Sequence, residues 1–202
     1  MGGNSSPILA DLYLSWLEFQ YMNKLIKSDC HRAKLLSSNC RYLDDIVTPN
    51  FNDFLLDSKL IYPNDLVLEA NKTDDNNDNI RDHFLDLDIS INKDNFCFNV
   101  YNKVDSFNFK VISFPFAKSC IPTNIGYNTF YSQLVRYLNI CSTVKYFQIK
   151  TKVLLDLFIN HGYRKFLLNK YFFKFCLNNR GKLLKYNINN FTNFQKDLGQ
   201  IY

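Results

Sequence analysis

The stretch Asn39-Cys40-Arg41-Tyr42-Leu43-Asp44-Asp45-Ile46-Val47 places two adjacent carboxylates between short runs of strand-forming residues. Aromatic and β-branched side chains favour strands and Asp favours turns, so the stretch predicts a β-hairpin with Asp44-Asp45 at its tip. Two carboxylates about 5 Å apart repel by roughly 3 kcal/mol at an effective dielectric near 20. A divalent cation would relieve this repulsion, since Mg²⁺ takes carboxylate oxygens together with phosphates and water. The alternative is a solvated turn, in which water screens the two charges.

Three segments of the chain resemble reverse transcriptases, in the order in which that family carries them. Tyr42-Leu43-Asp44-Asp45 resembles the Tyr-x-Asp-Asp signature of the palm hairpin. Upstream, Met1-Gly2-Gly3-Asn4-Ser5-Ser6-Pro7-Ile8-Leu9-Ala10-Asp11-Leu12-Tyr13 resembles the Gly-rich, Ser-Pro segment that precedes that hairpin. Downstream, Phe84-Leu85-Asp86-Leu87-Asp88-Ile89 resembles the Phe-Leu-Asp-Leu segment of retroelement polymerases, especially those of Penelope-like elements.

The resemblance implies a role for each of these segments. Nucleotidyl transfer in the family uses two divalent ions, Mg²⁺ or Mn²⁺. Asp44 would be a direct metal ligand with Asp45 nearby, which makes both the candidate catalytic residues. Lys72 matches a family lysine that contacts or protonates the pyrophosphate leaving group, although a loop lysine is commonly just solvated. The candidate residues for the incoming nucleotide and the template base are Gly2, Gly3, Ser5, Ser6, Pro7 and Tyr42.

The family needs another carboxylate that this sequence does not visibly supply. That Asp lies on a strand before the Gly-Ser-Pro segment, whereas Asp11 is expected on a helix and Asp86 on a later strand. The resemblance therefore implies the C-terminal half of a palm followed by a thumb, weakly active or inactive by itself. Its implied partners are a primer-template duplex, deoxynucleoside triphosphates and the upstream half of the polymerase.

The expected fold class is α+β. A partial polymerase palm, an antiparallel sheet with helices on one face, would occupy residues 1–113. A helical thumb-like bundle would follow over 114–180, and a loosely ordered tail over 181–202. No apolar run approaches the 18 or more residues of a membrane span, and no signal peptide is visible, so we expect an intracellular protein without membrane contact.

Within residues 1–113, periodicity predicts the following elements. A helix capped by Ser6 would run from Pro7 to about Ile26. Its broad apolar face would consist of Ile8, Leu12, Trp16 and Phe19 with Leu9, Tyr13 and Leu17. A polar loop would cover 28–38, and a helix over 51–60 would turn Phe51, Phe54, Leu55 and Ile61 inward. A short strand would follow at 66–68. Alternation predicts a three-stranded meander over 84–91, 96–101 and 107–112, with Leu85 on the packed face and Asp86 and Asp88 facing solvent.

Charge is distributed unevenly along the chain. Residues 1–100 carry nine Lys/Arg against sixteen Asp/Glu, and residues 101–202 carry fifteen against three. An acidic half could gather cations and a basic half could gather phosphates, although two solvated faces would show the same segregation. The six cysteines are scattered without a Cys-x-x-Cys pair, so neither a zinc site nor a disulfide framework is indicated.

The basic half predicts three helices: 127–140, one capped by Ser142 or Thr143 and ending at His161-Gly162, and 163–177. These helices resemble a polymerase thumb, whose helices track the duplex backbone, and phosphate contacts there give affinity without sequence specificity. The candidate residues for contacts with the nucleic-acid backbone are Arg136, Lys145, Lys150, Lys152, Arg164 and Lys165. Two other hypotheses stay open at this point. One is a retroelement remnant that binds nucleic acid without chemistry, and the other is an unrelated metal-binding or structural domain.

Overall fold

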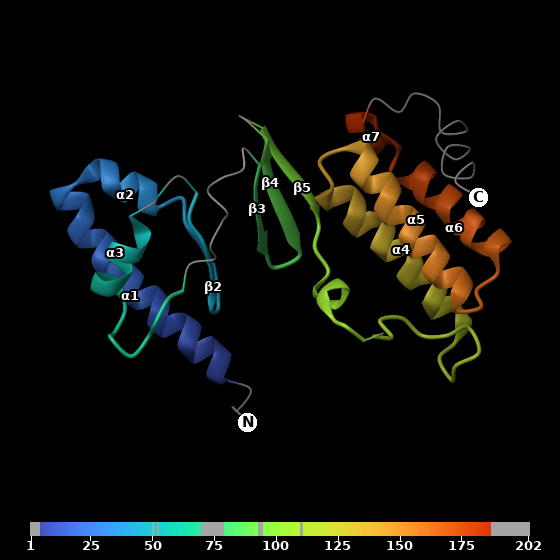
Figure 1. Cartoon of the computed structure of the whole chain (residues 1–202), viewed down its shortest axis with the longest axis horizontal. Coiled ribbons are helices and arrows are strands. Elements are labelled where there is room, and N and C mark those ends of the chain that lie inside the picture. Colours follow the sequence, from blue (N-terminus) through green and yellow to red (C-terminus); the bar gives the residue numbers. More distant parts are fainter. Residues whose placement is uncertain are drawn as a thin grey trace. The chain divides into compact units, whose positions relative to one another are not determined.

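The chain divides into two units, residues 1–74 and 75–202, and each is described by itself. The computed structural model describes residues 5–49, 51, 53–69, 79–92, 95–109 and 111–186, with only the backbone at 79, 80, 92 and 105 (Figure 1). The division falls after residue 74, whereas the predicted boundary between the palm and the thumb lies after residue 113. Both units mix helices with a small antiparallel sheet, so the α+β class is confirmed.

Unit 1 packs three helices beside a short hairpin. The helices are α1 (Ser6–Ser28), α2 (Cys30–Leu36) and α3 (Phe54–Ile61), and the hairpin pairs β1 (Cys40–Tyr42) with β2 (Asp45–Val47). Seven residues are buried together at its centre: Leu25, Ala33, Leu36, Phe51, Phe54, Ile61 and Tyr62.

Helix α2 was predicted as loop. It forms because the Asp29 side chain accepts a hydrogen bond of 3.0 Å from the backbone N–H of Arg32, which satisfies one free amide of the first turn. The Arg32 guanidinium donates in turn to both carboxylate oxygens of Asp57 on α3, which is 1% exposed. This ion pair turns Asp57 inward, whereas Leu55, predicted inward, is 41% exposed.

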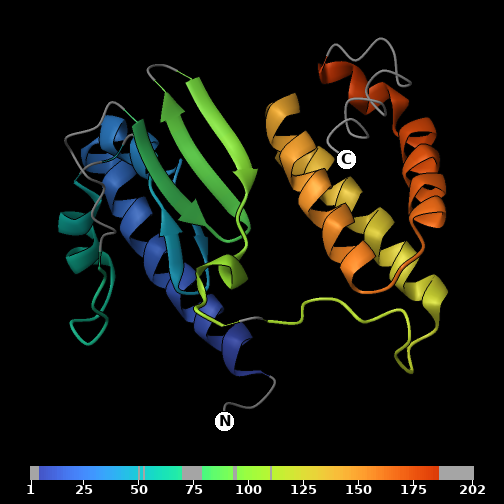
Figure 2. The ribbon, with the colours of Figure 1, turned by 45° about the vertical axis from the view of Figure 1, so that its right-hand side comes forward.

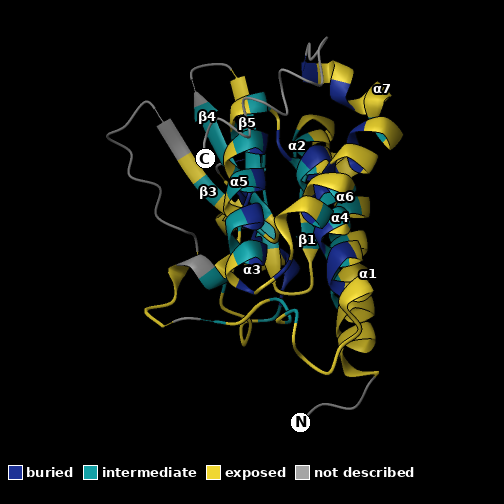
Figure 3. Cartoon of the chain, turned by 90° about the vertical axis from the view of Figure 1, so that its right-hand side faces the viewer, coloured by how far each residue is buried: buried dark blue, intermediate teal, exposed yellow. Residues whose placement is uncertain are grey.

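Most of the apolar face predicted for α1 is exposed, and of its residues only Leu17 packs on the core. Ile8, Leu12 and Phe19 are 70%, 66% and 63% exposed, and Figure 3 shows α1 largely in the colour of exposed residues. The opposite side of the helix packs on the core of unit 1 instead, through Leu14, Leu17, Tyr21 and Leu25. The helix begins at Ser6, with Ser5 as N-cap and without a capping side-chain bond, one residue before the predicted start.

Unit 2 begins with a meander of three antiparallel strands, β3 (Asn79–Phe84), β4 (Leu87–Asn92) and β5 (Asn95–Val100) (Figure 2). A meander was predicted, but its strands are shifted along the sequence. Phe84 pairs with Leu87, so Leu85 and Asp86 form a two-residue turn inside the predicted first strand. The predicted strand over 107–112 is not formed in the described residues, where η1 (Lys103–Ser106) and irregular chain follow β5. Residues 66–68 are likewise not a strand.

Asp88 faces away from solvent, contrary to prediction. It is 7% exposed and accepts two hydrogen bonds from Arg81, at 2.7 and 2.6 Å. This bidentate pair across β3 and β4 compensates the burial of the carboxylate, and it raises the pKa of Arg81. Leu85 is 42% exposed in the turn and does not share the packed face.

The helices of unit 2 are α4 (Thr123–Ile140), α5 (Val144–Asn160), α6 (Lys165–Asn178), the short α7 (Arg180–Leu183) and η2 (Leu184–Tyr186). The three predicted helices are confirmed. Thr143 caps α5 by accepting from the Tyr146 N–H, and Gly162, at φ +86°, ends it in the left-handed region. Leu183 and Tyr186 are buried, so the unit continues past the predicted boundary at 180.

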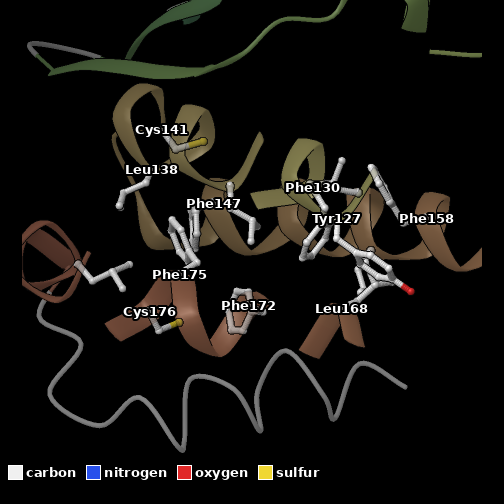
Figure 4. Close-up of a cluster of buried hydrophobic side chains, with 14 of the residues drawn as sticks. Tyr127, Phe130, Leu138, Cys141, Phe147, Phe158, Leu168, Phe172, Phe175 and Cys176 are labelled. Atoms are coloured by element: carbon white, nitrogen blue, oxygen red, sulfur yellow. The ribbon is translucent and has the colours of Figure 1, made fainter. Parts of the chain in front are cut away.

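Aromatic rings fill the core between these helices. Phe147 and Phe175 lie with ring centroids 6.1 Å apart, and Phe130 and Phe158 pack edge to face at 5.4 Å (Figure 4). All four are at most 1% exposed, which makes this the better-packed unit. Among the described residues, no helix combines the length and the apolar character needed to cross a membrane.

Candidate functional site

The β1–β2 hairpin presents the two candidate carboxylates to solvent. Tyr42 pairs with Asp45, so the two-residue turn consists of Leu43 and Asp44, and Asp45 is the first residue of β2. The predicted hairpin is therefore confirmed, with its tip one residue earlier than expected. Asp44 and Asp45 are both exposed, and neither forms an ion pair with another described residue.

Arg41, inside β1, fastens this hairpin to helix α1. Its Nε donates to Glu18 Oε1 at 2.6 Å, its Nη1 to Asp11 Oδ1 at 2.7 Å, and its Nη2 to Ser15 Oγ at 2.9 Å. These three acceptors follow each other at four and three residues along α1, which places them on one face of the helix. Two carbonyl oxygens, of Asp11 and Leu43, accept from the same guanidinium at 3.3 Å.

The Arg41 side chain is only 9% exposed, so these bonds form where water competes weakly. Burial lowers the pKa of Arg41, but its hydrogen bonds to Glu18 and Asp11 and the negative charges of these carboxylates raise the pKa above its ordinary value. Tyr62, which follows α3, adds a hydrogen bond of 2.6 Å from its hydroxyl to Glu18. Burial, and then this bond, raise the pKa of Tyr62. The network ties β1, α1 and the end of α3 together around one guanidinium.

Leu43 turns the hairpin in an uncommon conformation. Its φ of 54° lies in the left-handed region, which costs an ordinary L-residue roughly 1–2 kcal/mol. The hydrogen bond from Arg41 to its carbonyl holds this peptide in place. Leu85 shows the same geometry, with φ 53°, in the turn of the β3–β4 hairpin.

The two hairpins therefore share a turn, Leu at positive φ followed by Asp, in Tyr42-Leu43-Asp44-Asp45 and Phe84-Leu85-Asp86-Leu87. Their carboxylates differ in what surrounds them. Asp86 forms an ion pair of 2.9 Å with Arg136 on α4, whereas Asp44 has no such partner among the described residues and has a second carboxylate beside it. Backbone strain is thus a property of the turn, and the unneutralised charge is specific to the first hairpin.

Charge around the first hairpin is negative in excess. The network that supports the hairpin holds the carboxylates of Asp11 and Glu18 against the guanidinium of Arg41, and the hairpin adds the carboxylates of Asp44 and Asp45. Such an excess attracts cations. Mg²⁺ is often bound through one or two carboxylates completed by phosphate and water, so the donors present fit one ion. No group of three or more Asp, Glu, His or Cys side chains suited to a metal occurs within the described parts of the chain, so a two-ion set is not assembled there.

The other predicted nucleotide-binding residues are placed as follows. Gly2, Gly3 and Lys72 lie outside the described residues. Ser5, Ser6 and Pro7 are exposed at the start of α1, and Tyr42 is 57% exposed on β1. In unit 1 the structure therefore brings together the β1–β2 hairpin and the Asp11–Glu18 face of α1, through Arg41.

One of the residues predicted to contact the nucleic-acid backbone, Arg136, already interacts within unit 2. It forms an ion pair with Asp86 and donates a hydrogen bond to Gln133. Lys145, Arg164 and Lys165 are exposed, and Lys150 and Lys152 are half-buried. Between Thr123 and Tyr186 the sequence carries eleven Lys/Arg and a single acidic residue, Asp156. The helices of unit 2 are therefore strongly basic.

Arg41, Glu18 and Tyr62 were not predicted as supports of the hairpin. One signal was available in the sequence: Asp11, Ser15 and Glu18 interrupt the otherwise apolar run over residues 8–19 at helical spacing and so predict a polar contact on one face. No family model, curated protein or solved structure matches this chain.

Proposed function

We propose that the β1–β2 hairpin is the carboxylate part of a reverse-transcriptase-like nucleotidyl-transfer site, binding Mg²⁺ or Mn²⁺ together with a deoxynucleoside triphosphate. The observation that carries the proposal is the hairpin itself. It exposes Asp44 and Asp45, which are adjacent in the sequence, without an ion-pair partner among the described residues and in the Tyr-x-Asp-Asp sequence context. A solvated turn would need no support, whereas this one is anchored by a nearly buried arginine.

Each residue of the hairpin has a distinct task in this proposal. Asp44, in the turn, is the metal ligand, and Asp45, at the start of β2, supplies the second carboxylate. A bound Mg²⁺ would neutralise charge on the triphosphate and the leaving group. Arg41 does not neutralise the carboxylates, because its donors are directed to α1 and to the Leu43 carbonyl. Its contribution is to fix the position of the turn.

Mg²⁺-dependent binding of a fluorescent deoxynucleoside triphosphate to the full chain tests the proposal. We expect binding that EDTA abolishes, that is lost in Asp44→Asn, and that survives Asp86→Asn in the equivalent turn of unit 2. Primer extension at high protein concentration then asks whether the chain also performs the transfer. Nucleotide binding that is equal in wild type and Asp44→Asn, or absent from wild type, would reject the proposal.

A second candidate, a nucleic-acid-binding protein without chemistry, is favoured by the eleven basic residues and one acidic residue between Thr123 and Tyr186 in unit 2. It predicts oligonucleotide binding that is salt-dependent and indifferent to both Asp44→Asn and EDTA. Binding of this kind without any Mg²⁺-dependent nucleotide binding would select the second candidate over the first.

A further inference from the structure

Helix α6 carries an apolar stripe on the side that faces away from its core. Phe166, Phe173 and Leu177 are 77%, 50% and 60% exposed, although they follow each other at helical spacing. The opposite side of the helix packs inward through Leu168, Phe172, Phe175 and Cys176 (Figure 4). The core of unit 2 is therefore complete without the stripe, and neighbouring exposed apolar side chains of this kind are typical of an interaction surface.

Lysines accompany this stripe. Lys170 and Lys174 are exposed on the same side of α6, and neither forms an ion pair with another described residue. The sequence of α6 contains three lysines and no Asp or Glu. Positive charge beside exposed aromatic rings is complementary to a ligand that has both phosphates and flat apolar faces.

A hollow of about 360 Å³ lies beside the stripe, where α4 packs against α6. It is lined by Asn128, Tyr131, Ser132, Tyr171, Lys174 and Asn178. Lys174 both accompanies the stripe and lines the hollow, so the stripe and the hollow form one continuous surface. The Asn178 amide donates to the Tyr131 hydroxyl at 3.2 Å, so amide and hydroxyl groups are held at the edge of the hollow. Such groups suit the hydrogen-bonding edges of nucleobases.

We propose that this surface of α6, which we call the α6 face, binds a single-stranded nucleic acid by base stacking on Phe166 and Phe173 and by phosphate contacts from Lys170 and Lys174. The two rings are seven residues apart, about 10 Å along the helix axis. Unpaired bases expose the faces that such rings stack on, whereas a duplex hides them between neighbouring base pairs. The proposal does not depend on the metal chemistry at Asp44.

A membrane surface is the other ligand that attracts phenylalanines flanked by lysines. It is disfavoured by the hollow, because hydroxyl and amide side chains there would meet lipid without gaining hydrogen-bond partners from acyl chains. The observations therefore favour nucleic acid, and the experiment below includes vesicles so that a membrane ligand would be seen.

The test is fluorescence anisotropy of a labelled, non-self-complementary oligonucleotide titrated with the full chain. We expect the double variant Phe166→Ala/Phe173→Ala to weaken binding about tenfold or more while leaving the salt dependence unchanged. Lys170→Gln/Lys174→Gln should instead flatten the slope of log affinity against log salt by about 1 to 2. Phe166→Tyr/Phe173→Tyr keeps the stacking surface and should bind like wild type.

The matched control is Ile149→Ala/Val153→Ala, which removes two apolar side chains that are 50% and 59% exposed on α5 of the same unit. Its oligonucleotide affinity should stay within twofold of wild type, and Asp44→Asn should also bind normally. Since all replaced side chains are exposed, circular dichroism melting should show intact folding. The proposal is overturned if Phe166→Ala/Phe173→Ala binds the oligonucleotide as the control does, if a duplex loses affinity equally, or if only binding to phosphatidylserine vesicles falls.

Discussion

Arg41 Nη1 donates a hydrogen bond of 3.3 Å to the carbonyl oxygen of Leu43, the residue whose positive φ turns the β1–β2 hairpin. The same guanidinium reaches Asp11, Ser15 and Glu18 on α1. The strained turn and the helix are thus held by one side chain, and the position of Asp44 depends on it. Replacing that side chain should affect both the stability of unit 1 and the geometry of the tip.

Arg41→Ala should lower the free energy of unfolding of unit 1 by about 2–3 kcal/mol, because it leaves Glu18 with only the Tyr62 hydroxyl. Arg41→Lys keeps the charge but loses the planar fork, so we expect a smaller loss of about 1–2 kcal/mol. Urea unfolding followed by the fluorescence of Trp16, the single tryptophan and a residue of α1, measures both. Lys24→Ala, an exposed position on the same helix, should change stability by less than about 0.5 kcal/mol. Equal stability of Arg41→Ala and wild type would contradict the anchoring role.

Leu43→Gly should be more stable than Leu43→Ala by about 1 kcal/mol, because both remove the side chain and only Gly relieves the positive φ. At ordinary positions the order is reversed, since Ala loses less backbone entropy than Gly on folding. Leu85→Gly and Leu85→Ala should repeat the pattern in the second hairpin. Chemical denaturation measures the free energy of unfolding of the four variants. An Ala variant at least as stable as its Gly counterpart would argue against the positive φ of the turn.

Much of the fold follows from local signals in the sequence. Thr143, Gly162 and Pro63 mark helix ends that the structure shows where they were expected, because capping, positive φ and the residue before proline are local effects. The strand positions of unit 2 were wrong because Leu85 has no turn preference of its own, and its positive φ is set by the pairing of β3 with β4. The burial of Asp88 was missed for a similar reason, since it depends on Arg81 across the sheet.

Gly126→Ala should destabilise unit 2 by about 2–3 kcal/mol. A Cβ at residue 126 would overlap the ring and hydroxyl of Tyr163. The Tyr163 side chain cannot move aside freely, because it is 4% exposed and packed between Tyr127 and Phe158. Gly181→Ala is the matched control, because no atom lies within 4 Å of its added methyl group, and a slight gain in stability is expected there. Thermal unfolding by circular dichroism compares the two, and a Gly126→Ala variant as stable as Gly181→Ala would contradict this packing.

The buried Cys176 makes stability depend on alkaline pH. Burial raises the pKa of its thiol to about 12 from an ordinary value near 9, so the folded state keeps the thiol neutral while the unfolded chain ionises. This contribution is complete below pH 9 and is lost as the pH rises from 9 towards 12. We therefore expect the stability of wild type to fall more steeply above pH 9 than that of Cys176→Ala. Parallel curves from urea titrations at several pH values would refute it.

Thiol labelling gives a separate check on the same core. Cys30, Cys40 and Cys120 are exposed, and Cys141 and Cys176 are buried. In native protein at pH 8 the three exposed thiols should react rapidly with a disulfide reagent, and the two buried ones only after unfolding. Mass spectrometry of labelled peptides distinguishes them. Rapid native labelling of Cys176 would mean that the core between α4 and α6 is open.

The candidate site was predictable only in part. Adjacent carboxylates flanked by strand formers were sufficient for the hairpin and for Asp44 and Asp45. The residues that support the hairpin could not be predicted, because the contact between Arg41 and Glu18 joins residues 23 positions apart and depends on how β1 lies against α1. Arg136 illustrates the converse, since a basic residue predicted to contact phosphate is paired with the turn carboxylate of Asp86.

Mn²⁺ titration of the full chain, followed by the electron paramagnetic resonance signal of the free ion, measures whether the β1–β2 hairpin binds a metal. We expect saturable binding by wild type that Asp44→Asn abolishes and that Asp86→Asn, in the equivalent turn paired with Arg136, leaves intact. Binding that is the same in wild type and Asp44→Asn, or no saturable binding by wild type at all, would contradict the proposal.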